Sequence, residues 1–516
     1  MGELVLAIDA GTTNLRVCVF HPDGRLLGQS TLPVETRVPA PGLVEQDADA
    51  IWRSVQTAIG RTLARIGRTA SDLACIGVTS QRTSALLWDR ATGEPLTPLV
   101  VWSDLRGVAR ARTLNREAGT ALAPQQAAAK LESLVESRRD VAADRMAFGN
   151  IDTFLIWKLS GGGAHLMDRS QAWPTGYLDL STLGWNRDLI AFQSLSPEIF
   201  PTLCDSWGAL ATSDPKVLGA AVPIAADIAD QQSALIGQDC ERPGEFKVTY
   251  GTSATLDVST GGAFLYPDPN FPPFILSAVG GDFRFCLEGM VFTAGAALDW
   301  LRATFGLGDH QAFAALADSV TSSDGVAFLP ALQGLGAPWG DPNRRAALHG
   351  LSGASGRGQI ALAGLESIAF RVCEIHQRLG QLTDLPPADQ LRADGGLTGS
   401  DRLMQLQADL IGLPVARHAQ REATAAGAAL CAARGVGLLA PDEGRSFVGH
   451  DRVFEPRISA DEAAARLAAW QAAVHPPRGL TSDLRAAPPP PRPAAPASPW
   501  AHSARSRPRC DPPGTW

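Results

Sequence analysis

A short turn near the N-terminus carries the first residues whose types could do chemistry. Asp9 follows the apolar run 4–8, and Gly11-Thr12-Thr13 come directly after it. Glycine lets backbone N–H groups approach an anion closely, and hydroxyl groups donate hydrogen bonds to phosphate oxygens. A carboxylate can hold Mg²⁺ through the water shell of the ion. The turn is therefore a candidate site for phosphate and magnesium, and the same residues would also suit an ordinary hairpin.

A second turn, Gly251-Thr252-Ser253, stands in the same context about one lobe further along the chain. Each turn lies between two short apolar runs that are typical of strands, so that strand, turn and strand repeat as in an antiparallel meander. The expected strands are 4–8, 15–20, 26–32, 247–250 and 255–259. The internal repeat predicts a duplicated fold in which the two turns hold phosphates from opposite sides. Two short matches could also arise by chance.

A third candidate is Asp230, which lies where the apolar run 222–227 gives way to the helical pattern 233–238. In α/β folds, ligands approach the sheet where a strand passes into a helix. A carboxylate at this place could take the proton of an attacking hydroxyl group. The alternative is an aspartate that caps the N-terminus of the helix.

A glycine-rich segment, 394–400, joins the strand pattern 390–393 to a helical pattern over 401–410. The N-terminus of a helix is electropositive, and glycine leaves room for a base or a ribose, so the segment suits a nucleotide. The spacing of a P-loop does not occur. A GxGxxG motif after the first strand does not occur either, and this second absence argues against a dehydrogenase.

Composition limits the class of protein. A chain of 516 residues is too long for a single hydrophobic core, so two or three domains are expected. Hydrophobic residues make up 45% of the chain and charged residues 19%, which is typical of globular proteins. Strand patterns mixed with amphipathic helices, such as 48–66, predict an α/β fold. The net charge of −8 is spread along the chain and argues against nucleic acid or a membrane surface as a partner.

Cysteine usage and the chain ends indicate a cytoplasmic protein. The eight cysteines are scattered without a CxxC pair, so reduced core thiols are expected rather than disulfides or a zinc site. No segment approaches the roughly 18 apolar residues of a membrane span, and no signal peptide is apparent. Beyond residue 475 a mixture of Pro, Ala, Arg and Ser predicts a disordered tail.

Taken in order, these segments closely resemble the FGGY family of carbohydrate kinases, in the actin/Hsp70/hexokinase superfamily, and its glycerol kinase-like branch in particular. The segments that carry the resemblance are LAIDAGTTNLRVCVF, IADQQSALIGQ, KVTYGTSATL, FTAGAALDWLR, FLPALQGLGAPWGDPNRRAALHGLS, LRADGGLTGSDRLMQLQADLIGLPV and EATAAGAA. The family implies two ribonuclease-H-like lobes, as in actin-like ATPases, with a cleft between them. We accordingly expect an acceptor-binding lobe over 1–240, a nucleotide-binding lobe over 241–475 and the tail over 476–516.

The resemblance also implies roles for single residues. Asp9 matches the carboxylate associated with Mg²⁺, Asp230 the general base and Gln231 a contact to the substrate. The positions that match contacts to ATP are Thr12, Thr13, Asn14, Arg16, Gly251, Thr252, Gly295, Gly396 and Ser400.

The acceptor pocket is where this sequence departs from the glycerol kinases that it resembles. Arg82 and Trp102 match their positions, with the indole expected to pack on the carbon chain of the acceptor. Thr83 stands where those kinases carry Glu, and Gln125 where they carry Tyr. The lost carboxylate and phenol imply an acceptor other than glycerol.

The resemblance thus implies transfer of the γ-phosphate of ATP to a hydroxyl group of a sugar or polyol, with Mg²⁺, by a homodimer or homotetramer. Two alternatives remain open at this point. One is a glycerol kinase proper, and the other is a non-catalytic, actin-like protein that binds a nucleotide or a sugar.

Overall fold

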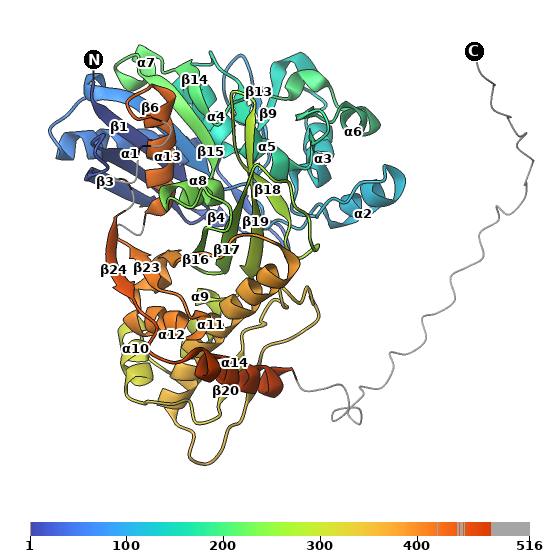
Figure 1. Ribbon diagram of the computed structural model, residues 1–516. Helices are drawn as coiled ribbons and strands as arrows, with labels where there is room; N and C mark the ends of the chain where they lie inside the picture. The colour runs from blue at the N-terminus through green and yellow to red at the C-terminus, as the bar shows by residue number, and fades with distance from the viewer. Residues whose placement is uncertain (1, 420–421, 441–442, 444–446, 448, 476–516) are drawn as a thin grey trace, which may run out of the picture. The chain divides into compact units, whose positions relative to one another are not determined.

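Two mixed β-sheets, each covered by helices, organise the computed structural model (Figure 1). The structure describes residues 2–419, 422–440, 443, 447 and 449–475. The predicted tail, 476–516, lies outside the described residues.

The first sheet contains the N-terminal turn. β1 consists of seven buried residues, LVLAIDA, as expected for a strand whose two faces are both covered. In spatial order the strands are β14 (Trp207–Thr212), β15 (Pro223–Ala229), β6 (Leu73–Ser80), β1 (Leu4–Ala10), β2 (Asn14–Phe20) and β3 (Leu26–Pro33). β1 pairs in parallel with β6, and β6 with β15, whereas the other neighbours are antiparallel.

The second sheet contains the second turn. In spatial order its strands are β18 (Pro273–Val279), β19 (Asp282–Val291), β17 (Ala254–Gly261), β16 (Phe246–Tyr250), β22 (Leu391–Asp394), β23 (Val415–His418) and β24 (His450–Phe454). β16 pairs in parallel with β22, and β22 with β23, whereas the other neighbours are antiparallel.

The two sheets repeat one arrangement. The order β3-β2-β1-β6-β15-β14 matches β19-β17-β16-β22-β23-β24 in both position and direction, and β18 is an addition at the edge. The predicted duplicated α/β fold is therefore confirmed. One difference lies in the connection, because β14 precedes β15 in the chain whereas β24 follows β23.

Helix α13 (Ala423–Gly435) comes from the C-terminal half of the sequence but packs on the first sheet. It contacts β1, β6 and β15 and lies along α8 (Asp230–Gly237), so that an orange helix stands among blue and green elements in Figure 1. The division of the chain into an acceptor-binding lobe and a nucleotide-binding lobe near residue 240 stays a prediction.

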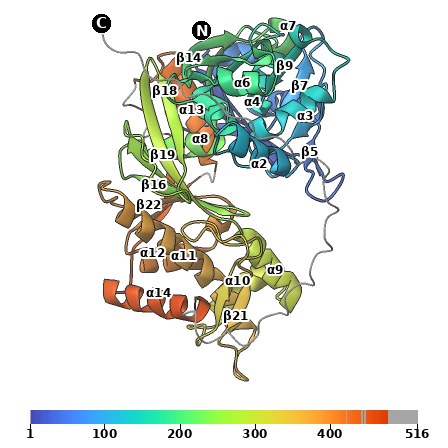
Figure 2. The same cartoon turned by 90° about the vertical axis from the view of Figure 1, so that its right-hand side faces the viewer.

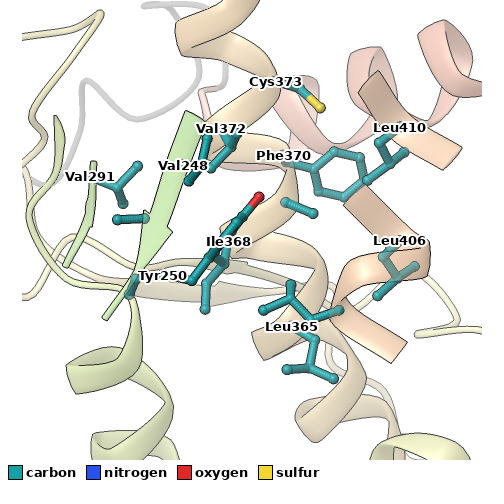
Figure 3. Packing of buried hydrophobic residues seen from close by; sticks show 14 of the residues in the cluster. Val248, Tyr250, Val291, Leu365, Ile368, Phe370, Val372, Cys373, Leu406 and Leu410 are labelled. Atoms are coloured by element: carbon teal, nitrogen blue, oxygen red, sulfur yellow. The ribbon is translucent and has the colours of Figure 1, made fainter. Parts of the chain in front are cut away.

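The second sheet rests on the long helix α11 (Arg357–Leu382), beside which lie α12 (Asp401–Ile411) and α14 (Ala460–Val474) (Figure 2). Figure 3 shows how Val248 and Tyr250 of β16 share one apolar cluster with Ile368 of α11 and Leu410 of α12. This core fixes the strand that ends at the second turn. The remaining helices of the C-terminal half are α9 (Gly295–Phe305) and α10 (His310–Asp318).

The segments between β6 and β15 build the region that carries the predicted acceptor residues. A small sheet of β7 (Leu86–Asp89) and β9 (Met146–Gly149) follows the end of β6, and another contains β4 (Thr36–Arg37), β5 (Glu45–Gln46) and β8 (Leu99–Val100). The main helices of the N-terminal half are α1 (Ala48–Arg65), α2 (Val108–Glu117), α3 (Leu131–Glu136), α4 (Ile151–Leu159), α5 (Arg169–Ala172), α6 (Arg187–Phe192) and α7 (Pro215–Leu218).

The described cysteines and helices agree with two expectations. Seven cysteines are free thiols, and all of them except Cys204 are buried. Among the described helices, none combines the length and the apolarity that a membrane crossing requires.

Three carboxyl groups lie fully buried beneath the end of β6. Ser80 donates to Asp152 at 3.0 Å, and the backbone N–H of Asp168 donates to Asp227 at 2.9 Å. Burial raises the pKa of all three, and for Asp227 the charges of the other two raise it further. One oxygen of Asp227 has no hydrogen-bond partner. Because three adjacent buried carboxylates repel one another, the folded state favours a protonated Asp227.

Asp227→Asn is expected to stabilise the protein, and to do so more at pH 8 than at pH 5. A raised pKa means that the folded state keeps a proton that the unfolded state releases above about pH 4, so this group costs stability as pH rises. The gain in unfolding free energy at pH 8 should be about 1 kcal/mol or more. Urea titrations at both pH values measure it, with the exposed Asp144→Asn as the control. An equal effect at both pH values would contradict the assignment.

Candidate active site

Asp9 lies at the end of β1, buried, with Arg16 of β2 beside it. The guanidinium of Arg16 is 3.5 Å from Asp9 and 2.8 Å from Glu422, which directly precedes α13. Burial raises the pKa of Asp9 to about 7, although Arg16 opposes the rise. Arg16 therefore joins the first turn to the C-terminal half of the chain. β1 and β2 do form the hairpin that the sequence left open, with the N–H of Gly11 donating to Asn14 at 3.1 Å.

The first turn is connected to the predicted acceptor residues through side chains. The indole of Trp102 donates to the hydroxyl of Thr12 at 3.0 Å, and that hydroxyl donates to Gln81 at 3.1 Å. Gln81 donates in turn to Gln46 at 2.8 Å, and Gln46 returns a hydrogen bond to the carbonyl of Thr12 at 2.7 Å. The predicted phosphate turn and the predicted wall of the acceptor pocket are thus one network. Thr13 is exposed, and its carbonyl accepts from the N–H of Val34 at 2.9 Å.

The second turn is joined to α9 through backbone atoms. The N–H of Gly295 donates to the carbonyl of Gly251 at 3.0 Å, and the N–H of Ala294 donates to Thr252 at 2.9 Å. A Cβ atom on Gly295 would lie 2.7 Å from the carbonyl oxygen of Gly251, so only glycine permits this close approach. The structure therefore brings Gly251, Thr252 and Gly295 together, as the resemblance implied.

The glycine-rich segment also reaches the second turn, through a residue that the sequence did not single out. Gly395 has φ +90°, and a Cβ atom on it would lie 2.5 Å from the carbonyl of Tyr250. Gly396 faces open space, with no atom within 4 Å of its Cβ position. Ser400 caps α12, its hydroxyl accepting from the N–H of Leu403 at 3.2 Å. The assigned contacts of Gly396 and Ser400 to ATP stay predictions.

Asp230 is the first residue of α8 and lies beside Arg82. Ala229 occupies the N-cap position, so the alternative of a helix-capping aspartate is wrong. The guanidinium of Arg82 is 3.5 Å from Asp230 and 2.6 Å from Glu288 of β19. Burial raises the pKa of Asp230, whereas Arg82 lowers it. The ring of Phe274 lies 4.5 Å from the guanidinium carbon of Arg82.

Gln231 follows Asp230 and faces a buried cation. The ammonium of Lys247, on β16, donates to the Oε1 atom of Gln231 at 2.6 Å and to Thr249 at 2.8 Å. It also pairs with Asp257 of β17 at 2.7 Å, and both side chains are 1% exposed or less. Burial opposes the charge of Lys247, but Asp257 and other carboxylates outweigh it and raise its pKa.

The two positions that depart from glycerol kinases have different surroundings. Thr83 adopts φ +57°, which is unfavourable for a β-branched residue, and its hydroxyl donates to the carbonyl of Arg82 at 2.7 Å. Gln125 is exposed and has no hydrogen bond to Arg82, Trp102 or Asp230 within the described chain. Thr83 thus directly follows Arg82 at the site, and the contact of Gln125 to the acceptor stays a prediction.

Sequence reasoning missed the groups that hold the site from the C-terminal half. These are Lys247, Asp257, Glu288 and Glu422. Asp257 had a signal that could have found it, because it is the one charged residue in its strand, and Glu288 stands in the apolar second half of a strand whose other charges lie near its start. A charge in such a place needs a partner, but the pattern does not say which one.

Comparison with known proteins agrees with this arrangement. Residues 4–237 match the N-terminal domain of the FGGY family of carbohydrate kinases, and residues 246–436 match its C-terminal domain. A glycerol kinase of Alkalilimnicola ehrlichii is 38% identical over 497 residues, covering 93% of this chain and 99% of that protein. One of Aromatoleum aromaticum is 37% identical over 494 residues, covering 92% and 99%.

Solved structures have the same fold. The glycerol kinase of Plasmodium falciparum with ADP has a TM-score of 0.82 at 26% identity, covering 91% of this chain and 97% of that one. A xylulose kinase of Rhodospirillum rubrum has a TM-score of 0.77 at 23% identity, covering 91% and 98%. The chain is therefore a member of the FGGY family of carbohydrate kinases, an ATP-dependent phosphotransferase that acts on an alcohol group.

Proposed function

We propose that this kinase phosphorylates a neutral polyol or ketose longer than glycerol, with Asp230 as the general base. The observation that carries the proposal is the position of Asp230 at the start of α8, 3.5 Å from Arg82 and a quarter exposed. A carboxylate at this place can accept the proton of a hydroxyl group, and burial, which raises its pKa, makes it a better base.

In the proposed step, the hydroxyl group of the acceptor attacks the γ-phosphorus of ATP. Its proton passes to the carboxylate of Asp230, the new P–O bond forms, and the bond from the γ-phosphorus to the oxygen that bridges it to the β-phosphate breaks. The electron pair of that bond leaves with ADP. Such a reaction depends on positioning and electrostatic stabilisation rather than on covalent chemistry by the protein.

The residues at the first turn fit a magnesium ion. Asp9 is 4% exposed, with Arg16 at 3.5 Å as its ion-pair partner among the described residues. Asp394, at the end of β22, has a buried oxygen without a hydrogen-bond partner. Mg²⁺ takes one or two carboxylates and keeps several waters, so Asp9 is a group of the kind that suits it, and Asp394 is a second such carboxylate at the end of a strand of the other sheet. When bound, the ion would offset the negative charge of the nucleotide phosphates.

The two turns are proposed to hold the nucleotide. Thr12, Thr13 and Asn14 would line the phosphates on one side, and Gly251 and Thr252 on the other. The side-chain donors for phosphate oxygens would be the hydroxyls of Thr13 and Thr252 and the amide of Asn14. The remaining proposed contacts are those of Arg16, Gly295, Gly396 and Ser400. The location of the protein in the cytoplasm and its assembly as a homodimer or homotetramer stay predictions.

The charges around Asp230 favour an uncharged acceptor. Arg82 already faces Glu288 and Asp230, and Lys247 already faces Asp257. A sugar acid would add a further carboxylate to this group, and its repulsion by the resident ones would oppose binding. A neutral polyol or ketose can instead accept from Arg82 and donate to the carboxylates.

The size of the acceptor is inferred from Thr83. Glu at this position would extend further into the site than the short Thr83 side chain, whose hydroxyl is turned back to the carbonyl of Arg82. Space and unfilled hydrogen-bonding capacity then remain for additional hydroxyl groups. Glycerol is the second candidate, because the relatives from Alkalilimnicola ehrlichii and Aromatoleum aromaticum described above are glycerol kinases.

Asp230→Asn should reduce kcat by roughly 10²- to 10⁴-fold, because the positioned base is lost. Binding of ATP should stay close to that of the native protein, since Asp230 lies on the acceptor side. Turnover is measured by ADP release under conditions limited by chemistry, and nucleotide binding by calorimetry. More than about half of the native rate would rule out Asp230 as the base.

The native enzyme should prefer a four- to six-carbon polyol or ketose to glycerol in kcat/KM. A site built to pair hydroxyl groups rejects an acceptor that leaves its polar groups unmatched, by up to roughly 10⁴-fold. The double variant Thr83→Glu, Gln125→Tyr should shift the preference toward glycerol. Since Gln125 is exposed, the single variants serve as the control, and Thr83→Glu should carry most of the shift. Glycerol as the best acceptor of the native enzyme would refute the proposed preference but not the kinase activity.

A further inference from the structure

We propose that Lys247 is a positioning residue for the acceptor, because it fixes which face the amide of Gln231 presents. This inference rests on the proposed function, in which Gln231 contacts the acceptor. Lys247 belongs to β16 in the second sheet, and Gln231 to α8, which packs against the first sheet.

The Lys247 ammonium has three close partners. It donates hydrogen bonds to Gln231 at 2.6 Å and to Thr249 at 2.8 Å, and it forms an ion pair with Asp257 at 2.7 Å. The oxygens of Asp257 accept no hydrogen bond with favourable geometry within the described chain, so its attraction to Lys247 is one of charge. Because the buried cation is held from three sides, the atoms that it contacts are held with it.

The contact decides how the amide of Gln231 is turned. Only an oxygen can accept from an ammonium, so the Oε1 atom must face Lys247 and the NH₂ group must face the other way. A reversed amide would set two donors against each other. The side of Gln231 away from Lys247 therefore offers a hydrogen-bond donor next to Asp230, which is an acceptor. Such a donor suits an oxygen of a hydroxyl or carbonyl group.

Asp257 is what allows the cation to be there. Lys247 is fully buried, and an unpaired ammonium in such a place would lose its proton or destabilise the fold. Arg82 forms a second set of ion pairs, with Glu288 and Asp230. The role of Asp257 is to neutralise Lys247. Of these two side chains, it is Lys247 that donates a hydrogen bond to Gln231.

The same strand also reaches the phosphate side. β16 ends at Tyr250, directly before Gly251 of the second turn. Any displacement of β16 would move both the donors for the phosphate and the ammonium that holds Gln231. Lys247 thus fixes the position of the proposed acceptor contact, Gln231, relative to the second turn.

The test replaces the ion pair without leaving a charge behind. Lys247→Met with Asp257→Leu substitutes apolar groups of similar size, which buried pairs often tolerate. Acceptor binding is measured by calorimetry without ATP and as KM, using the compound with the highest kcat/KM in the acceptor screen. We expect acceptor affinity to fall about tenfold, as for a lost hydrogen bond to a charged site, with KM for ATP within about twofold. The matched control is Arg466→Met with Glu366→Leu, an ion pair between α14 and α11 that lies at 3.0 Å.

A double-mutant comparison separates positioning from general packing. Adding Gln231→Leu to the double variant should lower acceptor affinity no further, because both changes remove one interaction. Unchanged acceptor affinity in a folded Lys247, Asp257 variant would overturn the proposal, and so would full additivity with Gln231→Leu.

A second variant keeps the test decisive where the double variant does not fold. Gln231→Glu retains an oxygen for Lys247 but removes the NH₂ donor, and should lower acceptor affinity about tenfold. Native-like affinity in Gln231→Glu would overturn the proposal. The two proposals are tested by different measurements. Turnover of Asp230→Asn tests the proposed base, whereas calorimetry of acceptor binding, which needs no catalysis, tests the role of Lys247.

Discussion

Burial of charge between the two sheets is the constraint on which the rest of the site depends. Asp230, Arg82, Glu288, Lys247 and Asp257 come from both halves of the chain, and each is held by a partner of opposite charge. An unpaired charge in such surroundings would cost several kcal/mol, so the pairs specify how the elements meet. The carboxylate of Asp230, the proposed base, is part of this arrangement rather than an addition to it.

The duplication supplies a scaffold, and the differences between its copies supply the chemistry. β1 and β16 occupy the same place in sheets of the same order. Yet the first strand carries Asp9 before its turn, where the second carries Thr249. The strand before the first turn therefore contributes a carboxylate, whereas the strand before the second contributes a hydroxyl group at the same place. The second copy instead contributes Lys247, whose ammonium reaches across to α8.

The network from Trp102 through Thr12 to Gln81 gives the acceptor side a direct connection to the phosphate turn. Gln81 precedes Arg82, so the hydrogen bonds run to the residue next to the cation at Asp230. The residues proposed to contact the acceptor and those proposed to contact the phosphates thus contact one another. Thr83 completes this segment in a strained conformation, and strain at such a place persists only where the surrounding contacts hold it.

The sequence by itself determined the α/β class, the internal repeat, the strands around both turns and the family, because apolar periodicity and ordered motifs are local properties. It also indicated Asp9, Asp230 and Arg82, since each stands at the end of a strand pattern. Tertiary structure alone decided which charges meet: Glu288 with Arg82, Glu422 with Arg16, and Asp257 with Lys247 and through it Gln231. It also decided that α13 packs on the first sheet and that Gln125 stays exposed. The reason is physical: a lone charge in an apolar strand requires a partner, but only the packing of distant segments determines which one lies within reach.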